Sequence, residues 1–104
     1  MMDATLHKFG YPETLIKEYN HWRLLCRKEQ VTLGSLILIS KDEQAISFSQ
    51  LSTDSFIEFE LIVKEVETKL KGFLEYEKIN YLMLMMVDPE VHFHIIPRYS
   101  KDKK

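Results

Sequence analysis

Two histidines placed two residues apart form the pattern in this chain with the clearest chemical use. His92 and His94 lie in the run Glu90-Val91-His92-Phe93-His94-Ile95-Ile96-Pro97-Arg98. If this run is a β-strand, both imidazoles share one face with Glu90 and Arg98, and the apolar residues between them take the other face. A strand with one buried face holds its remaining side chains rigidly, which a catalytic nucleophile requires.

The imidazole pair is compatible with three kinds of chemistry. Neutral imidazole is a good nucleophile toward phosphorus, and its ordinary pKa of about 6.5 leaves it largely neutral at pH 7. The pair can also be structural, with both rings hydrogen-bonded, or it can belong to a metal site. Glu90 and His94 lie about 13 Å apart along a strand at ~3.3 Å per residue, so they do not converge on one ion. A metal would therefore need a third ligand from elsewhere, such as His7 or His21.

The run over residues 90–98 resembles the histidine triad (HIT) family of nucleotide hydrolases and transferases. The family pattern is His-φ-His-φ-His-φ-φ, where φ is apolar, often followed by Pro-Arg. His92 takes the middle, nucleophilic position and His94 the third, whereas Glu90 takes the first, where the family has histidine. The chain is most similar to a short-loop bacterial branch, because only Asp88-Pro89 stands where many members have a longer phosphate-binding loop.

This resemblance implies an enzyme in which His92 attacks the α-phosphate of a nucleotide derivative and water then releases the nucleoside monophosphate. The substrate would be a phosphoanhydride or phosphoramidate of the diadenosine polyphosphate or AMP-conjugate type, and the attack needs no cofactor or metal. His94 would hydrogen-bond a phosphate oxygen and stabilise charge in the transition state. The alternatives are a nucleotide-binding protein with little or no turnover, or a His-x-His metal site.

Four further residues are candidates for substrate binding by their place relative to the family. Asp88 precedes the triad, and Ser35 follows the glycine of an earlier strand, where many members have histidine. Arg27 lies nearest to the place where an asparagine is often found near the ribose. Arg98 is expected to add positive charge or to neutralise Glu90.

Glu90 is expected to belong to the catalytic group and to slow the reaction. In the family, the backbone carbonyl of the first triad position orients the nucleophile, and glutamate retains that carbonyl. An ionised carboxylate repels an incoming phosphate and raises the pKa of His92, so that more of this imidazole is protonated at pH 7. Glu90→His is therefore expected to raise kcat/KM on a nucleotide substrate.

The elements that must position these residues follow the family's order over residues ~14–99, which predicts one HIT-like domain of class α+β with a five-stranded, largely antiparallel sheet. A hairpin is predicted over 14–19 and 22–26, although the pattern alone also permits one helix over 14–27. A buried strand led by Gly34 is predicted over 35–40. The triad strand closes the order.

One long helix and one apolar strand are predicted between these parts. Ser52 is the expected N-cap of a helix over about 53–75, with Asp54 in its first turn. Apolar residues at spacings of three and four form a stripe expected to pack on the sheet: Phe56, Phe59, Val63, Val66, Leu70 and Phe73. The run 79–87 is apolar on both faces, so it is predicted to be central in the sheet, with the helix on one face and the second subunit of a homodimer on the other.

Composition limits the remaining possibilities. The 104 residues are 45% hydrophobic, which is enough for one domain over 1–104 with an irregular lead-in over 1–12 and a charged tail over 101–104. The net charge of −2 argues against a nucleic-acid partner. Cys26 is the single cysteine and forms no internal disulfide, which favours a cytoplasmic location. Without an apolar run of ~18 residues or a signal-peptide pattern, no membrane association is expected.

Overall fold

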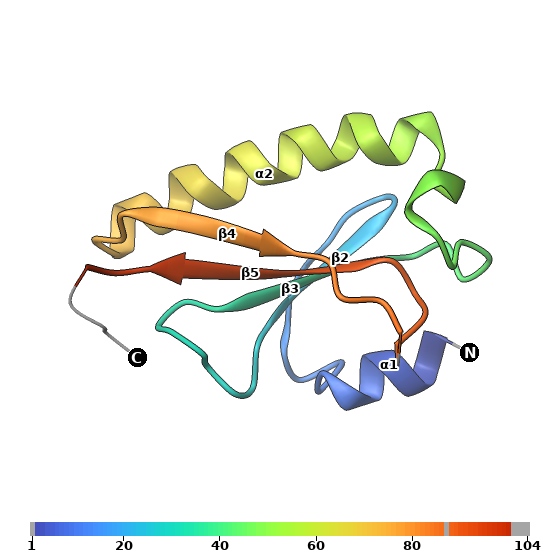
Figure 1. Ribbon diagram of the computed structural model, residues 1–104, viewed down its shortest axis with the longest axis horizontal. Coiled ribbons are helices and arrows are strands. Elements are labelled where there is room, and N and C mark those ends of the chain that lie inside the picture. Colours follow the sequence, from blue (N-terminus) through green and yellow to red (C-terminus); the bar gives the residue numbers. More distant parts are fainter. Residues whose placement is uncertain (1, 87, 101–104) are drawn as a thin grey trace.

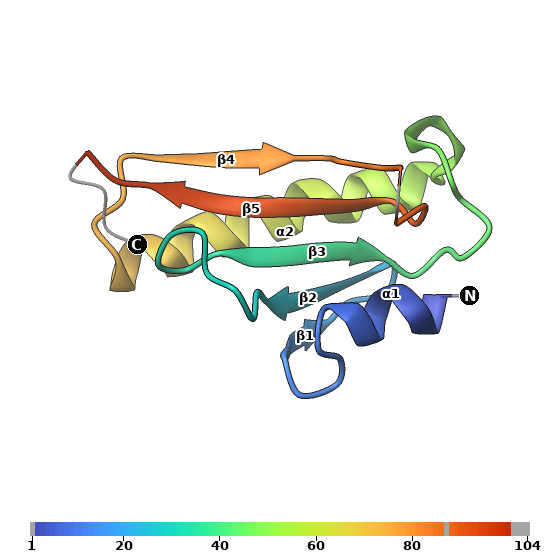
Figure 2. The same cartoon turned by 60° about the horizontal axis from the view of Figure 1, so that its bottom comes forward.

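A five-stranded sheet lies between two helices in the computed structural model, which describes residues 2–86 and 88–100. The elements in chain order are α1 (Met2–Lys8), β1 (Leu15–Glu18), β2 (Trp22–Cys26), β3 (Leu36–Ser40), a short 3-10 helix (Phe48–Gln50), α2 (Thr53–Phe73), β4 (Lys78–Leu82) and β5 (His92–Arg98). The strand order is β1-β2-β3-β5-β4, and all neighbouring strands are antiparallel. The long helix α2 covers one face of the sheet, and α1 lies against the other (Figures 1 and 2). The predicted α+β architecture is confirmed.

The predicted hairpin over β1 and β2 is confirmed, and the alternative of a single helix is wrong. Successive residues of β2 point to opposite faces, as strand geometry requires. Trp22 and Leu24 enter the apolar cluster under α2, whereas Leu25 enters the cluster under α1. The Gly34 turn before β3 is also confirmed, with a φ of +89° that favours glycine.

The central strand of the sheet is β3, and its side chains build both cores. All five of its residues are buried. Leu36 and Leu38 pack under α2, while Ile37 and Ile39 pack under α1. Because β3 is covered on both faces, its sequence is apolar throughout.

Helix α2 begins as predicted, but its buried face is turned slightly from the predicted stripe. The Ser52 side chain caps the helix by accepting a hydrogen bond from the N–H of Ser55. Ile62 and Val66 are the buried apolar residues of the helix. Phe73 belongs to the predicted stripe but is 85% exposed.

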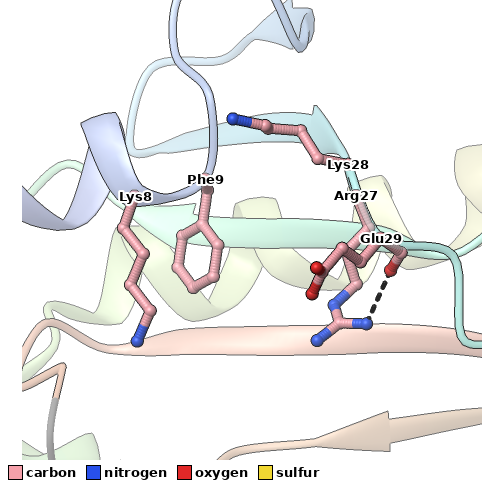
Figure 3. A pocket seen from close by; sticks show the side chains of 5 residues that line it. All are labelled: Lys8, Phe9, Arg27, Lys28 and Glu29. Carbon is pink, nitrogen blue, oxygen red and sulfur yellow. Dashed lines mark hydrogen bonds between the residues drawn. The ribbon is translucent and has the colours of Figure 1, made fainter.

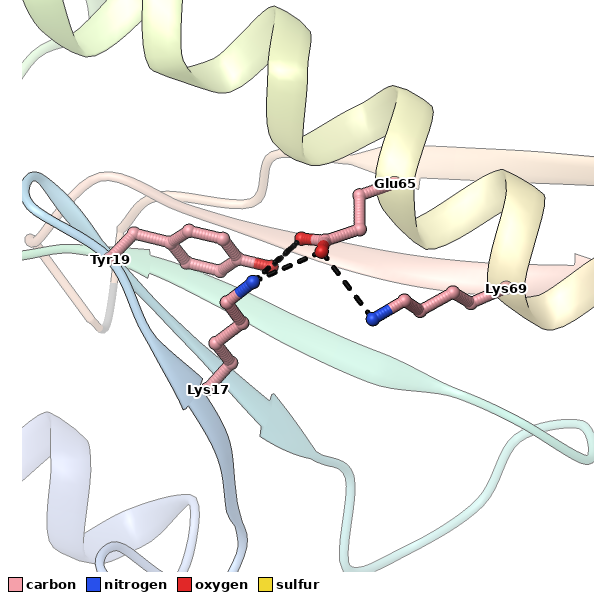
Figure 4. A network of polar contacts seen from close by, with 4 residues as sticks. All are labelled: Lys17, Tyr19, Glu65 and Lys69. Atoms are coloured by element: carbon pink, nitrogen blue, oxygen red, sulfur yellow. Dashed lines mark hydrogen bonds and ion pairs between the residues drawn. The ribbon is translucent and has the colours of Figure 1, made fainter.

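A polar network on the same face joins β1 to α2 (Figure 4). The Glu65 carboxylate accepts hydrogen bonds from the Tyr19 hydroxyl at 2.7 Å and from the Lys17 ammonium group at 3.0 Å, and it lies 3.5 Å from the ammonium group of Lys69. The hydrogen bond from Tyr19 is the main cause that lowers the pKa of Glu65 to about 2. The helix is thus tied to the hairpin by charge as well as by apolar packing.

The prediction of a central strand over 79–87 is wrong in extent and in position. The strand β4 ends at Leu82 and lies at the edge of the sheet, paired on one side with β5. The chain runs on beyond it without strand pairing to Met86, and Val87 lies outside the described residues. Leu84 and Met86 are 63% and 90% exposed, so the apolar residues of this segment are not all covered within one subunit.

The prediction of an irregular lead-in is also wrong, because α1 occupies most of it. Leu6 is 4% exposed and packs on Leu25, Ile37 and Ile39 from the sheet. A helix of seven residues is too short to be stable alone, so this packing rather than local propensity holds it. The charged tail 101–104 lies outside the described residues. Within residues 2–86 and 88–100, no helix is long and apolar enough to cross a membrane.

Candidate active site

The two histidines lie side by side on the face of the sheet that α1 covers. In β5, His92 and His94 alternate with Phe93 and Ile95, which pack under α2 on the opposite face. Their ring centroids are 5.2 Å apart. The predicted strand is therefore confirmed, with the histidines on one face and the apolar residues between them on the other.

The orientation of His92 is fixed by a backbone group. Its Nδ1 lies 2.8 Å from the carbonyl oxygen of Glu90, and because a carbonyl only accepts, Nδ1 carries the proton and donates it. In the neutral ring, the lone pair is then on Nε2, which is the nitrogen able to act as a nucleophile. His92 is 1% exposed, so little freedom is left to the ring.

The segment that contains α1 reaches the histidines through Phe9, which directly follows the helix. The Phe9 ring centroid lies 5.7 Å from that of His92 and 6.0 Å from that of His94. Lys8, at the end of α1, forms a 2.8 Å ion pair with Asp88. The N-terminal segment is therefore a wall of the site, a role that its sequence did not indicate.

Glu90 is tied to the same helix. Its carboxylate accepts a hydrogen bond from the Thr5 hydroxyl, and both residues are buried, at 4% exposure each. The expected repulsion of a phosphate requires this carboxylate to face the substrate, whereas here it faces α1. Glu90→His would consequently disturb the contact with α1 as well as remove a negative charge.

A cavity of about 500 Å³ opens beside the histidine rings. Its lining joins residues from four parts of the chain: Lys8, Phe9, Arg27, Leu84, Met85, Met86, Asp88, His92 and His94. Four of the residues predicted for the site are therefore brought together, namely His92, His94, Asp88 and Arg27. The lining combines polar and charged side chains with four apolar ones, namely Phe9, Leu84, Met85 and Met86.

Two other predicted site residues lie elsewhere. The Ser35 hydroxyl is buried and donates to the carbonyl of Thr32 at 2.8 Å, so it stabilises the turn before β3. Arg98 is six residues beyond His92, about 20 Å along a strand at ~3.3 Å per residue, and its guanidinium donates to Asn80 at 3.4 Å. Arg98 is thus too far away to neutralise Glu90. Neither Ser35 nor Arg98 lines the cavity.

His94 is held in its neutral form. Burial is the main cause that lowers the pKa of His94 to about 4, and the charges of His92 and Arg27 act in the same direction. At pH 7 its ring is therefore uncharged and interacts through hydrogen bonds rather than as a cation. A neutral ring can donate a hydrogen bond to an anion and stays unprotonated at pH 7.

The lowered pKa of His94 predicts a pH-dependent stability. As pH decreases from about 6.5 to 4.5, the unfolded chain takes up a proton on His94 before the folded protein does. The free energy of unfolding should therefore decrease as pH decreases over this range. Glu65 adds its own loss only as pH falls below its ordinary value of 4.5 toward 2. Urea unfolding at several pH values between about 6.5 and 4.5 measures how steeply the free energy of unfolding changes with pH. His94→Gln should flatten it, and an unchanged slope in this variant would contradict the assignment.

The described residues contain no group of three or more histidine, cysteine, aspartate or glutamate side chains placed to hold a metal ion. Neither His7 nor His21 joins His92 and His94 in such a group. The third ligand that the metal-site alternative requires is therefore not found in these parts of the chain.

Comparison with known proteins supports the fold. No family model matches the chain, and no curated protein matches it either. Among solved structures, it is similar to the crystal structure of the histidine triad protein blr8122 from Bradyrhizobium japonicum, with a TM-score of 0.74 and 22% sequence identity. The match covers 88% of this chain and 69% of the other. At this identity the likeness establishes the HIT-like fold, and the chemistry has to be argued from the site.

Proposed function

We propose that this protein is a nucleotide hydrolase or nucleotidyl transferase that uses His92 as its nucleophile. The observation that carries the proposal is the 2.8 Å hydrogen bond from Nδ1 of His92 to the carbonyl of Glu90, beside a cavity that His92 lines. This bond selects the tautomer whose Nε2 holds a lone pair. The resemblance of residues 90–98 to the histidine triad pattern supports the same assignment, because His92 takes the middle, nucleophilic position of that pattern.

The proposed reaction has two displacement steps at the α-phosphate. Nε2 of His92 forms a bond to phosphorus, and the bond from phosphorus to the leaving oxygen or nitrogen breaks, with its electron pair going to the leaving group. Water then attacks the same phosphorus, the bond to His92 breaks, and a nucleoside monophosphate is released. A covalent intermediate of this kind divides one difficult step into two easier ones.

The other groups of the cavity would bind the substrate. The neutral ring of His94 would donate a hydrogen bond to a phosphate oxygen, and Lys8 and Arg27 would balance its charge. The apolar lining residues Leu84, Met85 and Met86 would contact the base. Diadenosine polyphosphates and AMP conjugates contain both a phosphate group and a base.

A nucleotide-binding protein with little turnover is the second candidate. It is favoured by the 1% exposure of His92, since a buried nucleophile is reached by substrate only if neighbouring side chains move. The rings of Phe9 and His94 both lie against the His92 ring. Both candidates use the same cavity and differ only in whether a bond to His92 forms.

Trapping the intermediate distinguishes them. The protein is mixed with a diadenosine polyphosphate or an adenosine phosphoramidate, quenched within the first turnover and examined by peptide mass spectrometry. A nucleotidyl group on the peptide that contains His92 is expected, and none in His92→Ala. Binding of nucleotide without any adduct or product over many hours would favour the second candidate. Activity that is lost with a chelator and restored by zinc would contradict the proposed chemistry.

We also propose that the protein is a homodimer joined through the edge strand β4. An unpaired edge favours addition of another strand, and the exposed Leu82 and Leu84 add apolar area beside it. Sedimentation equilibrium at micromolar concentration should give the dimer mass. Leu82→Lys should weaken the dimer about tenfold or more, because a charge then replaces an apolar contact. Leu33→Lys, at an exposed position before β3, is the matched control, and a monomeric wild-type protein would refute the proposal.

A further inference from the structure

An apolar cavity lies on the face of the sheet opposite to the histidines, between the hairpin and α2. Its volume is about 140 Å³. The apolar residues that line it come from both hairpin strands, from β3 and from α2: Ile16, Leu24, Leu36, Val66 and Leu70. Leu24, Leu36 and Val66 are buried in the cluster under α2, so they form the inner part of this space.

This apolar cavity is separate from the nucleotide site. A cavity of about 290 Å³ at the end of α1, lined by four charged side chains and Phe9, does belong to that site (Figure 3). It shares Lys8, Phe9 and Arg27 with the cavity beside the histidines. The apolar cavity shares no lining residue with either of them, so a ligand there would bind independently of the nucleotide.

The solvent end of the apolar cavity is formed by the polar network that joins the hairpin to α2. Lys17, Tyr19, Glu65 and Lys69 all line the cavity, and Figure 4 shows their polar ends gathered between the hairpin and the helix. The side chains of Lys17 and Lys69 are 48% and 70% exposed. Two ammonium groups face one carboxylate here, which leaves one positive charge at the opening, in a chain whose net charge is −2.

Lys69 is the cation with bonding capacity to spare. The Glu65 carboxylate already accepts hydrogen bonds from Tyr19 at 2.7 Å and from Lys17 at 3.0 Å. Lys69 lies 3.5 Å from the same carboxylate, beyond the usual length of a hydrogen bond. Because an ammonium group has three N–H donors, Lys69 can bind a second anion without leaving Glu65 unpaired.

We propose that the apolar cavity binds a small monocarboxylate with a tail of about six carbons. An apolar cavity of about 150 Å³ stays dry and binds molecules the size of benzene, which sets the size of the tail. The tail would lie among Leu24, Leu36 and Val66, and the carboxylate would lie at the opening beside Lys69. The structure thereby assigns the chain a second ligand, on the face away from His92.

The test titrates four probes into the wild-type protein and follows the methyl signals of Leu24, Leu36 and Val66 by NMR. The probes are hexanoate, hexan-1-ol, hexylamine and acetate. Hexanoate should bind about threefold more tightly than hexan-1-ol, and hexylamine more weakly than either, because an exposed ion pair contributes modestly. Acetate should bind about a hundredfold or more weakly than hexanoate, since it lacks the apolar tail. Added salt should remove the preference for hexanoate over hexan-1-ol.

Two pairs of variants connect this binding to the cavity. Leu70→Phe should fill the space and abolish the shifts caused by all three six-carbon probes. Leu61→Phe, at an exposed position of the same helix, should leave them unchanged. Lys69→Gln should abolish the preference for hexanoate over hexan-1-ol. Lys64→Gln should keep that preference, although Lys64 pairs with Glu60 at the same i,i+4 spacing as Lys69 with Glu65. Thermal unfolding establishes that each variant is folded.

Three results would overturn the inference. The first is the absence of methyl shifts with every six-carbon probe at millimolar concentration. The second is tighter binding of hexylamine than of hexanoate, or an unchanged preference for hexanoate in Lys69→Gln. The third is a shift of the same methyl signals with protein concentration alone, which would place a second copy of the chain over the cavity. Because the nucleotide adduct on His92 is measured separately, none of these results decides the proposed function.

Discussion

His92→Ala is expected to lower kcat on a nucleotide substrate at least about a thousandfold, because loss of a nucleophile removes the covalent route itself. The cavity and the cations at Lys8 and Arg27 remain, so substrate affinity should change far less than kcat. Steady-state kinetics at pH 7 with an adenosine phosphoramidate measures both. A large fall in kcat with little change in substrate affinity would show that His92 acts in the chemical step and not in substrate binding.

A matched variant controls for the loss of an imidazole in general. His21 lies in the turn between β1 and β2, where its backbone N–H donates to Glu58 of α2 at 2.7 Å. His21→Ala should keep full activity. Because His92 is almost fully buried, the unfolding of His92→Ala must also be compared with that of the wild type. A folded His92→Ala that retains full activity would exclude this residue as the nucleophile.

Thr5→Val should cost roughly 2 kcal/mol of stability and also slow the reaction, because it leaves the buried carboxylate of Glu90 without its donor. The replacement has nearly the same shape as threonine, so the lost hydrogen bond accounts for most of the effect. Helix α1 supplies Lys8 and leads into Phe9 at the cavity, and a loosened helix would misplace both. Urea unfolding gives the stability, and kcat/KM gives the effect on the site.

A double-mutant cycle tests the same contact from both sides. Replacing both partners, as in Thr5→Val with Glu90→Leu, should recover much of the stability, because no buried polar group is then left unpaired. Thr68→Val, at an exposed position of α2, is the control for the threonine change. Strictly additive losses in the double variant would mean that Thr5 and Glu90 do not stabilise each other.

The parts of the fold that sequence predicted correctly are those with strong local signals. The alternation in β5 gave the faces of His92 and His94, and Ser52 gave the start of α2 because an N-cap is a local interaction. The order of the elements, together with the histidine pattern, gave the HIT-like architecture.

The parts that sequence missed depend on contacts between distant segments. Helix α1 is too short to form from propensity, and it exists through the burial of Leu6 and the hydrogen bond of Thr5 to Glu90, 85 residues away. The place of β4 at the sheet edge was hidden by its apolar residues, which resemble those of a central strand. Arg98 was predicted for the site from its face of the strand and its place in the family pattern, without regard to its distance along β5.

The hydrogen bond that orients His92 ends on a main-chain oxygen, and this has a consequence for the residue at position 90. Every amino acid has that oxygen, so the orientation of the His92 ring places no demand on which side chain stands at position 90. That side chain is then free to take another role, which in this chain is to accept the hydrogen bond from Thr5 that attaches α1. A change of the side chain at position 90 therefore leaves the hydrogen bond that orients His92 in place.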